Sequence, residues 1–549
     1  MRTVEAHDAA AERWDAIVAG TGIGGATLGF ALAQSGWRVL FCEKGRARGG
    51  DDLAGEYAES FFAAPAYPTR DHADTLRRAG RWADEIEDVS ASRRRSFVPF
   101  IGSGVGGSSA LYGMAMERLF PIDFEPARSH AAGTGASLPD AWPISYEDLA
   151  PFYSAAERLY RVRGTADPLR ADRSELLPAP PFTRAGTLLA QQFASRGLHP
   201  YRLPSACEYV EGCQSCQGYL CAKDCKNDSV RVCLAPALKR HGAALIDECE
   251  VVRLVAKGRT VDHVECRRRG QPLTLRARVV FLAAGALATP GILLRSVSEA
   301  WPTGFGNESR LVGRHLMRHL VDLYAVEVEG GEGSDNRVKE IALNDFYAKD
   351  GIKLGSVQSF GRFPPLEVVM QALLHDVRES AFRWALPFVR LGNPIIRREL
   401  AQLIERRFTL ATTLEDLPYA HNRVEASGAA GSGIALNYRL AAYERDRTVR
   451  FRSLMKEALA PLRYKLIGQV EKNERIAHAC GTCRFGDDPR MSVLDRNCRA
   501  HGLDNLYVVD SSFFPTSGGT NPSLTIAANA LRVAGKVSAA SDLRATTAP

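Results

Sequence analysis

The chain has 549 residues, a net charge of +7 at neutral pH, 45% hydrophobic residues and 24% charged residues. This length exceeds what one ordinary hydrophobic core supports, so we expect two or more domains with the composition of a soluble globular protein. The basic residues are scattered, apart from short runs such as 93–95 and 267–269. A solvated surface explains them better than a nucleic-acid groove, and we expect no nucleic-acid partner.

The sequence also bears on the cellular location. It contains no run of about 18 apolar residues, so no transmembrane segment is expected. The first 14 residues include Glu5, Asp8 and Glu12 and have no apolar core, unlike a secretory signal. Twelve cysteines without such a signal indicate a reducing compartment, where thiols or metal ligands are favoured over disulfides. We therefore predict a cytoplasmic protein.

A βαβ unit is predicted near the start of the chain. Residues 15–19 read as a buried strand, residues 26–35 as a helix and residues 38–42 as a second strand. Elements in this order, with a glycine-rich turn after the first strand, are typical of a dinucleotide-binding fold.

The turn has the pattern Gly-x-Gly-x-x-Gly, with glycines at 20, 22 and 25. Gly20 permits a tight turn, Gly22 lets the backbone approach a pyrophosphate, and Gly25 allows the helix to pack on the strand. Glu43 follows the second strand, where a carboxylate can bind ribose hydroxyls and disfavours the 2′-phosphate of NADP. The unit therefore predicts a bound dinucleotide, FAD or NAD.

Six cysteines lie between residues 207 and 233, and four of them are candidate metal ligands: Cys213, Cys216, Cys221 and Cys225. Cys213 and Cys216 have the C-x-x-C spacing of half a zinc or iron–sulfur site. The complete spacing matches no ferredoxin pattern, so we favour structural thiols or a disulfide, with iron–sulfur and zinc as alternatives. A second C-x-x-C, at 480–483, suggests either dithiol redox chemistry or packing.

Other elements are predicted along the middle of the chain. Ser145 begins a capped helix, whereas residues 175–184 and 330–336 read as loops. Residues 250–252 and 281–285 read as strand segments beside the bound dinucleotide. The tail after Ser538 has a disordered composition.

Residues 366–407 alternate apolar residues with arginine at helical spacing, interrupted by Pro387 and Pro394. We favour a pair of helices packed on the core, with a substrate lid or a membrane-contacting surface as alternatives. Residues 408–414 then read as a strand that ends at Glu415, a candidate substrate contact.

Three further motifs stand out along the chain. They are Gly104-Val-Gly-Gly-Ser-Ser-Ala-Leu-Tyr-Gly113, Gly285-Ala-Leu-Ala-Thr-Pro-Gly291, and a C-terminal series of His478, Gly481-Thr-Cys483, His501-Gly502, Asp510 and Asn521-Pro522. With these motifs and the glycine turn, the chain resembles the glucose–methanol–choline (GMC) oxidoreductases, most densely at its two ends.

The resemblance implies an α/β (α+β overall) protein with a Rossmann-like FAD-binding domain built from discontinuous segments, and a substrate domain with an antiparallel sheet and helices. We assign residues 1–130, 235–300 and 475–549 to the first domain. Residues 131–234 and 301–474, with the cysteine-rich insert 207–233, are assigned to the second. The implied FAD contacts are Gly20, Thr21, Gly22, Ile23, Gly24, Gly25, Glu43, Lys44, Gly104, Gly106, Gly107, Ser108, Val251, Val252, Ala284, Gly285, Asp510, Ser511, Asn521 and Pro522.

The resemblance also implies the chemistry. His478 and Asn521 hold the positions of the family's catalytic pair. Histidine suits the base that removes the hydroxyl proton of an alcohol, while flavin N5 takes the hydride. The amide of Asn521 can hydrogen-bond the developing alkoxide. His501 is expected to be structural or to lie near the cofactor.

Two positions differ from many relatives. Tyr112 stands where many have asparagine and is a tentative substrate contact. Leu111 stands where some relatives attach FAD through histidine, so we expect non-covalent FAD. The substrate is expected to be a small-molecule alcohol, sugar-like or a natural product. The cysteine-rich segment also resembles dehydrogenases of aminoglycoside intermediates. Oxygen or another redox carrier is the expected electron acceptor.

Three other functions compete with alcohol oxidation. A flavin disulfide reductase explains the glycine turn and a C-x-x-C, but it requires a second glycine-rich nucleotide motif that the sequence lacks. An electron-transfer dehydrogenase subunit would use the Cys207–Cys225 cluster and bind iron. A non-catalytic flavoprotein would not need His478.

Overall fold

The computed structural model describes residues 3–62, 72–130, 133–172, 174–213, 215–328, 339–361, 364–380, 382–427, 433–474 and 476–540. The predicted loop at 330–336 and residues 541–549 lie outside these ranges. The C-terminal helix α13 (Ser523–Ala539) runs one residue past Ser538.

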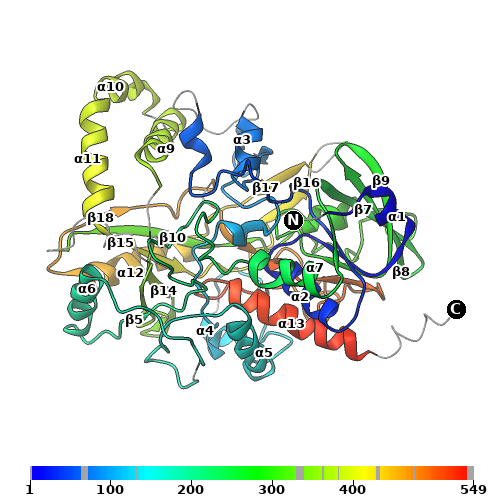
Figure 1. The fold of residues 1–549 in the computed structure, drawn as a ribbon. Coiled ribbons are helices and arrows are strands. Elements are labelled where there is room, and N and C mark those ends of the chain that lie inside the picture. Colours follow the sequence, from blue (N-terminus) through cyan, green and yellow to red (C-terminus); the bar gives the residue numbers. More distant parts are fainter. Residues whose placement is uncertain are drawn as a thin grey trace.

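A parallel sheet forms one half of the molecule (Figure 1). Its strands come from three separated stretches of the chain, as expected for a discontinuous dinucleotide-binding domain. In spatial order they are β6 (Ala244–Ile246), β2 (Val39–Cys42), β1 (Arg13–Ala19), β9 (Gln271–Leu282) and β20 (Leu506–Val508). The centre is buried on both faces, which explains why β1 and β2 read as continuous apolar runs.

The long strand β9 belongs to two pairings. Its second half pairs in parallel with β1 and β20, whereas its first half pairs antiparallel with β8 (Thr260–Arg268). Strand β8 in turn pairs with β7 (Cys249–Lys257), so a three-stranded antiparallel ribbon extends from the parallel sheet.

Small residues let helices pack closely on this sheet. Helix α2 (Ile23–Gln34) follows the glycine turn and packs against α13, which also contacts α5 (Tyr146–Leu159) (Figure 1). A methyl group added at Gly24 would lie 2.1 Å from the backbone oxygen of Val509, so only glycine fits there. Short helices cover the remaining parts: α1 (Ala6–Ala11), η5 (Val230–Leu234) and α7 (Ala235–Arg240).

An antiparallel sheet forms the second half. Its order is β18 (Tyr464–Ile467), β10 (Met317–Val326), β15 (Phe408–Leu414), β14 (Gly355–Ser359), β11 (Ile341–Leu343) and β5 (Tyr201–Arg202), and β19 (Ala477–Cys480) also pairs with β10. The threonine- and leucine-rich strand β15 is buried throughout. Helices α6 (Arg184–Ala194) and α12 (Ala442–Leu459) contribute apolar side chains to the same core.

A smaller sheet joins the two halves. It contains β16 (Arg423–Ala426), β17 (Ile434–Asn437), β3 (Ile86–Asp88) and β4 (Arg95–Phe97), packed with α3 (Ala73–Arg78), η1 (Ala58–Phe61) and α8 (Thr289–Arg295). The remaining short elements are η3 (Gly107–Ala110), η4 (Pro121–Phe124), α4 (Pro126–Ser129), β12 (Ala348–Lys349), β13 (Ile352–Lys353) and η8 (Ser511–Phe513). The α/β class is confirmed, whereas the exact domain boundaries stay a prediction.

Several local predictions are confirmed. The predicted βαβ unit corresponds to β1, α2 and β2 with shifts of one to three residues, and residues 408–414 coincide with β15. Ser145 caps α5: its hydroxyl accepts from the Asp148 N–H at 3.2 Å, and the Asp148 carboxylate accepts from the Ser145 N–H at 2.9 Å.

The preferred interpretation of residues 366–407 is wrong. They form α9 (Leu366–Glu379), η7 (Arg383–Ala385), α10 (Leu386–Leu391) and α11 (Asn393–Arg406), which project from the body (Figure 1). Helix α9 is anchored to the body through buried Met370 and an ion pair between Asp376 and Lys472. The helical periodicity of the sequence identifies an apolar face, but it does not show whether other parts of the protein cover that face. No helix in the described ranges has the length and hydropathy needed to cross a bilayer.

The close packing of α2 predicts opposite effects for two helical glycines. Gly24→Ala should lower the free energy of unfolding by about 1–3 kcal/mol, because the methyl group meets a backbone oxygen that cannot move freely. Gly535→Ala in α13 should raise it by about 0.4–1 kcal/mol, since nothing lies within 4 Å of the added carbon. Urea denaturation of the apoproteins measures both, and an unchanged Gly24 variant would contradict the packing.

Candidate functional site

A cavity runs along the carboxyl ends of the parallel strands and reaches the C-terminal motifs. Most of the residues predicted to contact the cofactor line it, together with Tyr112 and His478. They are Gly20, Thr21, Gly22, Ile23, Gly24, Glu43, Lys44, Gly107, Ser108, Val251, Ala284, Gly285, Asp510, Ser511 and Pro522.

Five predicted cofactor residues are not part of the lining of this cavity. Gly25 packs α2 on the sheet, because an added methyl group would lie 2.1 Å from the Gly20 oxygen. Gly106 donates its N–H to the Thr21 hydroxyl at 3.0 Å, and Gly104 accepts from the Gly107 N–H at 2.7 Å. Val252 accepts from the Arg295 guanidinium, and the fifth residue is Asn521.

The glycine turn has the shape that a pyrophosphate needs. Gly20 has φ +104°, and a side chain there would collide with the Ala283 oxygen at 2.4 Å. A methyl group at Gly22, in contrast, would meet no atom within 4 Å, so the backbone faces open space. Helix α2 begins at Ile23, and its unpaired N–H groups at this end favour an anion. The residues present therefore fit a dinucleotide.

The ribose end is built around Glu43. Its carboxylate accepts from the Thr21 hydroxyl at 2.6 Å and from the Gly45 N–H at 3.0 Å, while burial raises the pKa of Glu43. Trp82, on the same wall, was missed from the sequence, whereas Glu250 belongs to the strand segment expected beside the dinucleotide. The Lys44 ammonium lies 4.5 Å from the centre of the Trp82 ring and 3.3 Å from the Glu250 carboxylate. No sequence motif indicates Trp82, because this residue lies in a segment of the chain that is separate from the glycine turn and Glu43.

Asp510 ties together the loops under the cavity. Its carboxylate accepts from the Gly285 N–H at 2.8 Å, the Thr289 hydroxyl at 2.5 Å and the Ser512 N–H at 2.8 Å. Burial raises the pKa of Asp510, although the hydrogen bonds that it accepts from N–H and hydroxyl groups act in the opposite direction. The residue therefore fixes the geometry of the wall.

A histidine pair lies at the other end of the cavity. Nδ1 of His319 on β10 lies 2.8 Å from Nδ1 of His478 on β19. Nε2 of His319 lies 2.9 Å from the Gly518 oxygen and 3.2 Å from the Ser517 oxygen. His319 was not among the residues expected at the site, since only the pairing of β10 with β19 brings the two rings together.

The environment of His478 keeps its imidazole neutral. Burial lowers the pKa of His478 well below its ordinary value, and His319 and Lys339 lower it further. Burial also lowers the pKa of His319, and that of Lys339 to about 8. His478 has φ +58°, a conformation that non-glycine residues rarely adopt and that is concentrated at functional sites.

Asn521 lies next to this pair of histidines. Its Nδ2 lies 3.5 Å from Nε2 of His478, and its Oδ1 accepts from Nε2 of Gln358 on β14 at 2.9 Å. Gln358 is buried and therefore holds the Asn521 amide in one orientation. Sequence reasoning missed Gln358 because glutamine in a buried strand carries no motif.

The two tentative substrate residues differ in position. Tyr112 lines the cavity, but its hydroxyl donates to the Asn227 oxygen at 2.5 Å. Glu415 does not line the cavity: its carboxylate is fully buried against the Lys353 ammonium at 2.8 Å and His130 at 2.9 Å. Although burial alone would raise it, these two groups hold the pKa of Glu415 well below its usual range. The expected pocket contact of Glu415 is therefore not present.

The cysteine-rich segment folds into a group of neighbouring thiols. Sulfur–sulfur distances are 3.5 Å for Cys207–Cys213, 3.2 Å for Cys213–Cys225 and 3.5 Å for Cys221–Cys225. Cys213 thus contacts Cys207 and Cys225 rather than acting only with Cys216. The structure adds Cys207 to the four predicted candidates, and no disulfide is formed among the described cysteines. Whether these thiols are only structural stays a prediction.

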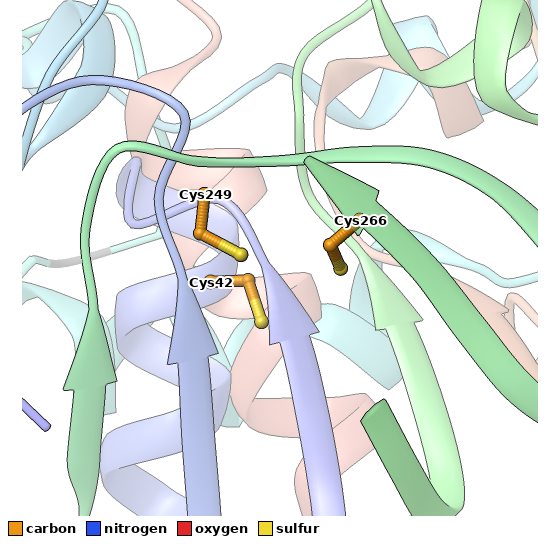
Figure 2. Close-up of side chains that lie close together, drawn as sticks. All are labelled: Cys42, Cys249 and Cys266. Carbon is orange, nitrogen blue, oxygen red and sulfur yellow. The ribbon is translucent and has the colours of Figure 1, made fainter. Parts of the chain in front are cut away.

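A second group of three thiols lies beside the ribose end of the cavity. Figure 2 shows Cys42 at the end of β2, Cys249 at the start of β7 and Cys266 on β8 pointing toward one another. Their sulfur atoms lie within 4.8 Å of one another, and all three residues are buried in the main hydrophobic core. Sequence spacing could not detect this group, because three strands contribute one residue each.

Three other residues singled out from the sequence do not line the cavity. Cys480 and Cys483 are buried, and burial raises the pKa of both thiols well above its ordinary value. This environment disfavours the reactive thiolate that dithiol redox chemistry requires. His501 does not line the cavity and hydrogen-bonds the Ser492 hydroxyl at 2.9 Å.

Comparison with protein families decides the affiliation. Residues 14–321 match the N-terminal family model of GMC oxidoreductase, and residues 418–530 match the C-terminal one. The chain is a GMC oxidoreductase. These enzymes are FAD flavoproteins that oxidise CH–OH groups, so this chain is an FAD-dependent enzyme.

This GMC oxidoreductase has curated relatives of similar length. It is 30% identical over 554 residues to the 6'''-hydroxyparomomycin C oxidase of Streptomyces lividus, covering 94% of this chain and 90% of that protein. It is 29% identical over 552 residues to the paromamine 6'-oxidase of Streptomyces fradiae, covering 95% and 90%. A solved Aspergillus oryzae formate oxidase has a TM-score of 0.64 and 16% identity, covering 97% of this chain and 99% of that one.

The open space at Gly22 predicts a specific loss of FAD binding. Gly22→Ala should weaken FAD binding by about tenfold or more, equivalent to about 1.4 kcal/mol, because the methyl group occupies space next to the expected pyrophosphate. The unfolding free energy of the apoprotein should stay unchanged. Fluorescence titration of apoprotein with FAD measures the affinity, and Gly535→Ala is a matched control away from the cavity. Equal FAD affinity would argue against this position for the pyrophosphate.

Proposed function

We propose that this enzyme oxidises a hydroxyl group of a sugar-like or natural-product alcohol to a carbonyl, with His478 as the base. The proposal depends mainly on one observation: the hydrogen-bond chain from Gly518 through His319 leaves Nε2 of His478 free to accept a proton. The hydrogen-bond partners of each ring nitrogen decide whether that nitrogen carries a proton.

The chain of hydrogen bonds begins at a backbone carbonyl oxygen. Nε2 of His319 lies near two carbonyl oxygens, which only accept, so this nitrogen carries the proton. In neutral His319, Nδ1 is then unprotonated and accepts from Nδ1–H of His478. His478, also neutral because of its lowered pKa, consequently presents an unprotonated Nε2. The nitrogen that can remove a proton is thus the one beside Asn521.

Asn521 is proposed to bind the substrate oxygen. Because its Oδ1 is engaged by Gln358, its Nδ2–H groups point toward His478 and the reacting position. An amide donor here stabilises negative charge that develops on the hydroxyl oxygen as His478 removes its proton. Gln358 and His319 act as positioning residues, since each orients one member of the pair.

The cofactor completes the reaction. When bound, FAD supplies the acceptor for the hydride that leaves the alcohol carbon. Residues of the glycine turn, Glu43 and the wall tied by Asp510 hold the dinucleotide. Leu111 is buried against apolar neighbours and offers no nucleophile, so we propose that FAD is non-covalent and leaves the polypeptide on acid precipitation.

The substrate class follows from relatives and from charge. The names of two relatives describe oxidation of aminoglycosides, which favours a hydroxyl on a sugar-like ring. Glu415, the expected substrate contact, is buried away from the cavity, while the Lys339 cation lies near His478. This balance favours a neutral polyol over a highly cationic amino sugar, which is the second candidate.

We propose a cytoplasmic location, with oxygen or another carrier as electron acceptor.

Two alternatives have distinct requirements. An electron-transfer dehydrogenase that uses the Cys207–Cys225 group must contain iron and acid-labile sulfide in stoichiometric amounts. A disulfide reductase must form a reactive thiolate, which the buried Cys480 and Cys483 disfavour. Neither is favoured by the family.

The proposed base predicts a large loss of turnover. His478→Ala should lower kcat by about 10²–10⁴-fold, because the hydroxyl proton has no acceptor. Anaerobic stopped-flow reduction of bound FAD by substrate measures this step, and the FAD content of the purified variant is the control. Asn521→Leu should also slow reduction, since the oxygen loses its amide donor. Normal reduction in His478→Ala would indicate that the imidazole is not the base.

The tautomer argument predicts a difference between two substitutions of His319. His319→Gln should keep activity within about fivefold, because an amide can accept from His478 and donate to the Gly518 oxygen. His319→Leu should lose about tenfold or more, since Nδ1–H of His478 has no acceptor and the tautomer is no longer fixed. Rates of FAD reduction at equal FAD occupancy make the comparison. Equal rates for both variants would contradict a positioning role.

The lowered pKa of His478 predicts the acid limb of the pH profile. The neutral base is present above its folded-state pKa and is lost as the pH falls through it. Because burial lowers that pKa below the ordinary value of about 6.5, kcat/KM should stay constant down to about pH 6.5 and decrease only below it. Steady-state rates across pH, with FAD retention checked at each point, test this. An acid limb above pH 7 would contradict the assignment.

The decisive experiment for the reaction class is a panel of alcohols under anaerobic conditions. Neutral sugars and polyols are compared with amino sugars that carry the same primary hydroxyl, and bleaching of the flavin absorption is followed. Bleaching by neutral compounds supports the favoured substrate class, and bleaching only by amino sugars supports the second candidate. Admitting air then distinguishes oxygen from another acceptor.

A further inference from the structure

The projecting segment has an exposed apolar end that the proposed reaction does not use. We define the helical tip as residues 382–398, which contain η7, α10 and the beginning of α11 (Figure 1). Phe382, Trp384, Phe388 and Ile395 are 65%, 66%, 66% and 72% exposed. Trp384 and Phe388 form an edge-to-face pair with ring centres 6.4 Å apart. Four large apolar side chains thus gather on one protrusion.

The same tip carries only positive charge. Residues 382–398 contain four arginines and no aspartate or glutamate. Arg397 pairs with Glu367 of α9 at 2.9 Å. Arg383 and Arg398 are exposed and have no carboxylate partner among the side chains that the structure describes. The tip therefore combines uncompensated cations with aromatic rings.

This combination differs from the rest of the surface. Other exposed apolar residues, such as Val449 and Met491, occur outside the tip on elements with mixed charge, and scattered residues of this kind are normal. A binding partner for the tip must cover aromatic rings and present negative charge to arginine. A bilayer that contains anionic lipid has both properties at its interface: acyl chains for the rings, and headgroup phosphates for the guanidinium groups.

We propose that the helical tip docks the enzyme on an anionic lipid surface. Phe382, Trp384, Phe388 and Ile395 enter the boundary between headgroups and acyl chains, while Arg383 and Arg398 contact phosphates. The tip lies on the membrane without crossing it. The FAD cavity is built from other elements, so docking leaves the chemistry at His478 unchanged.

Tryptophan fluorescence offers a direct readout. The chain contains six tryptophans, of which five are at most 7% exposed and Trp384 is 66% exposed. Quenching by lipids brominated on their acyl chains therefore reports mainly on Trp384. We expect quenching with vesicles of phosphatidylglycerol and phosphatidylcholine, and little with phosphatidylcholine alone. Cosedimentation of the holoenzyme with the same vesicles should measure binding independently.

Matched variants separate apolar from charged contributions. Phe382→Ser/Phe388→Ser keeps the fluorescent probe and should weaken vesicle binding by about tenfold or more. Arg383→Gln/Arg398→Gln should weaken binding to anionic vesicles by a similar factor and reduce its dependence on salt. Val449→Ser and Arg94→Gln/Arg490→Gln change exposed residues outside the tip and should bind like the unchanged enzyme.

Three outcomes would overturn the proposal. These are vesicle binding unaffected by the tip variants, equal binding to neutral and anionic vesicles, and no vesicle binding. If vesicles do not bind and the tip variants abolish a dimer in analytical ultracentrifugation, the occupant of the tip is a second copy of the chain. Turnover of a water-soluble alcohol should stay the same in every tip variant, which confirms that each variant is folded.

Discussion

In the proposed active site, the carbonyl oxygen of Gly518 fixes which ring nitrogens of the histidine pair carry protons. It accepts a hydrogen bond from Nε2 of His319, which leaves Nδ1 of the same ring as an acceptor for His478. Two neutral imidazoles in contact would otherwise have several tautomers of similar energy, and only some of them would present a basic nitrogen to the alcohol. A backbone group of fixed polarity removes this ambiguity, because a carbonyl oxygen has no proton to donate. Burial then disfavours the charged forms of both rings.

The fold brings this arrangement together from distant parts of the chain. His319 and His478 are 159 residues apart and meet because β10 pairs with β19. Asn521 precedes α13, which packs on α2 behind the glycine turn. The helix that packs behind the glycine turn thus also follows directly after the amide that we propose to be catalytic. The site for the dinucleotide and the site for the alcohol are therefore mechanically connected through α13.

Sequence reasoning identified what local patterns encode. Gly20, Gly22 and Glu43 lie where the motif predicts, because strand, turn and helix geometry fix the contacts of nearby residues. His319, Gln358 and Trp82 were missed, since each gains its role from a strand or loop distant in sequence. Glu415 was placed at the pocket because it follows a strand, but Lys353 and His130 lie beside it and pair with its carboxylate in the interior. The exposed tip was predicted to pack on the core because its apolar residues recur at helical spacing. That spacing does not show whether another element lies against the apolar face.

The topology of β9 has a consequence for how the protein is made. Its two flanking partners are β1, near the start of the chain, and β20 at residues 506–508. During synthesis, the buried strand Val279–Leu282 has an open hydrogen-bonding edge until residues 506–508 have left the ribosome. Such edges template pairing with other chains. Because β20 is made more than 200 residues after β9, we expect the nascent chain to expose this apolar edge to other chains before the sheet is complete.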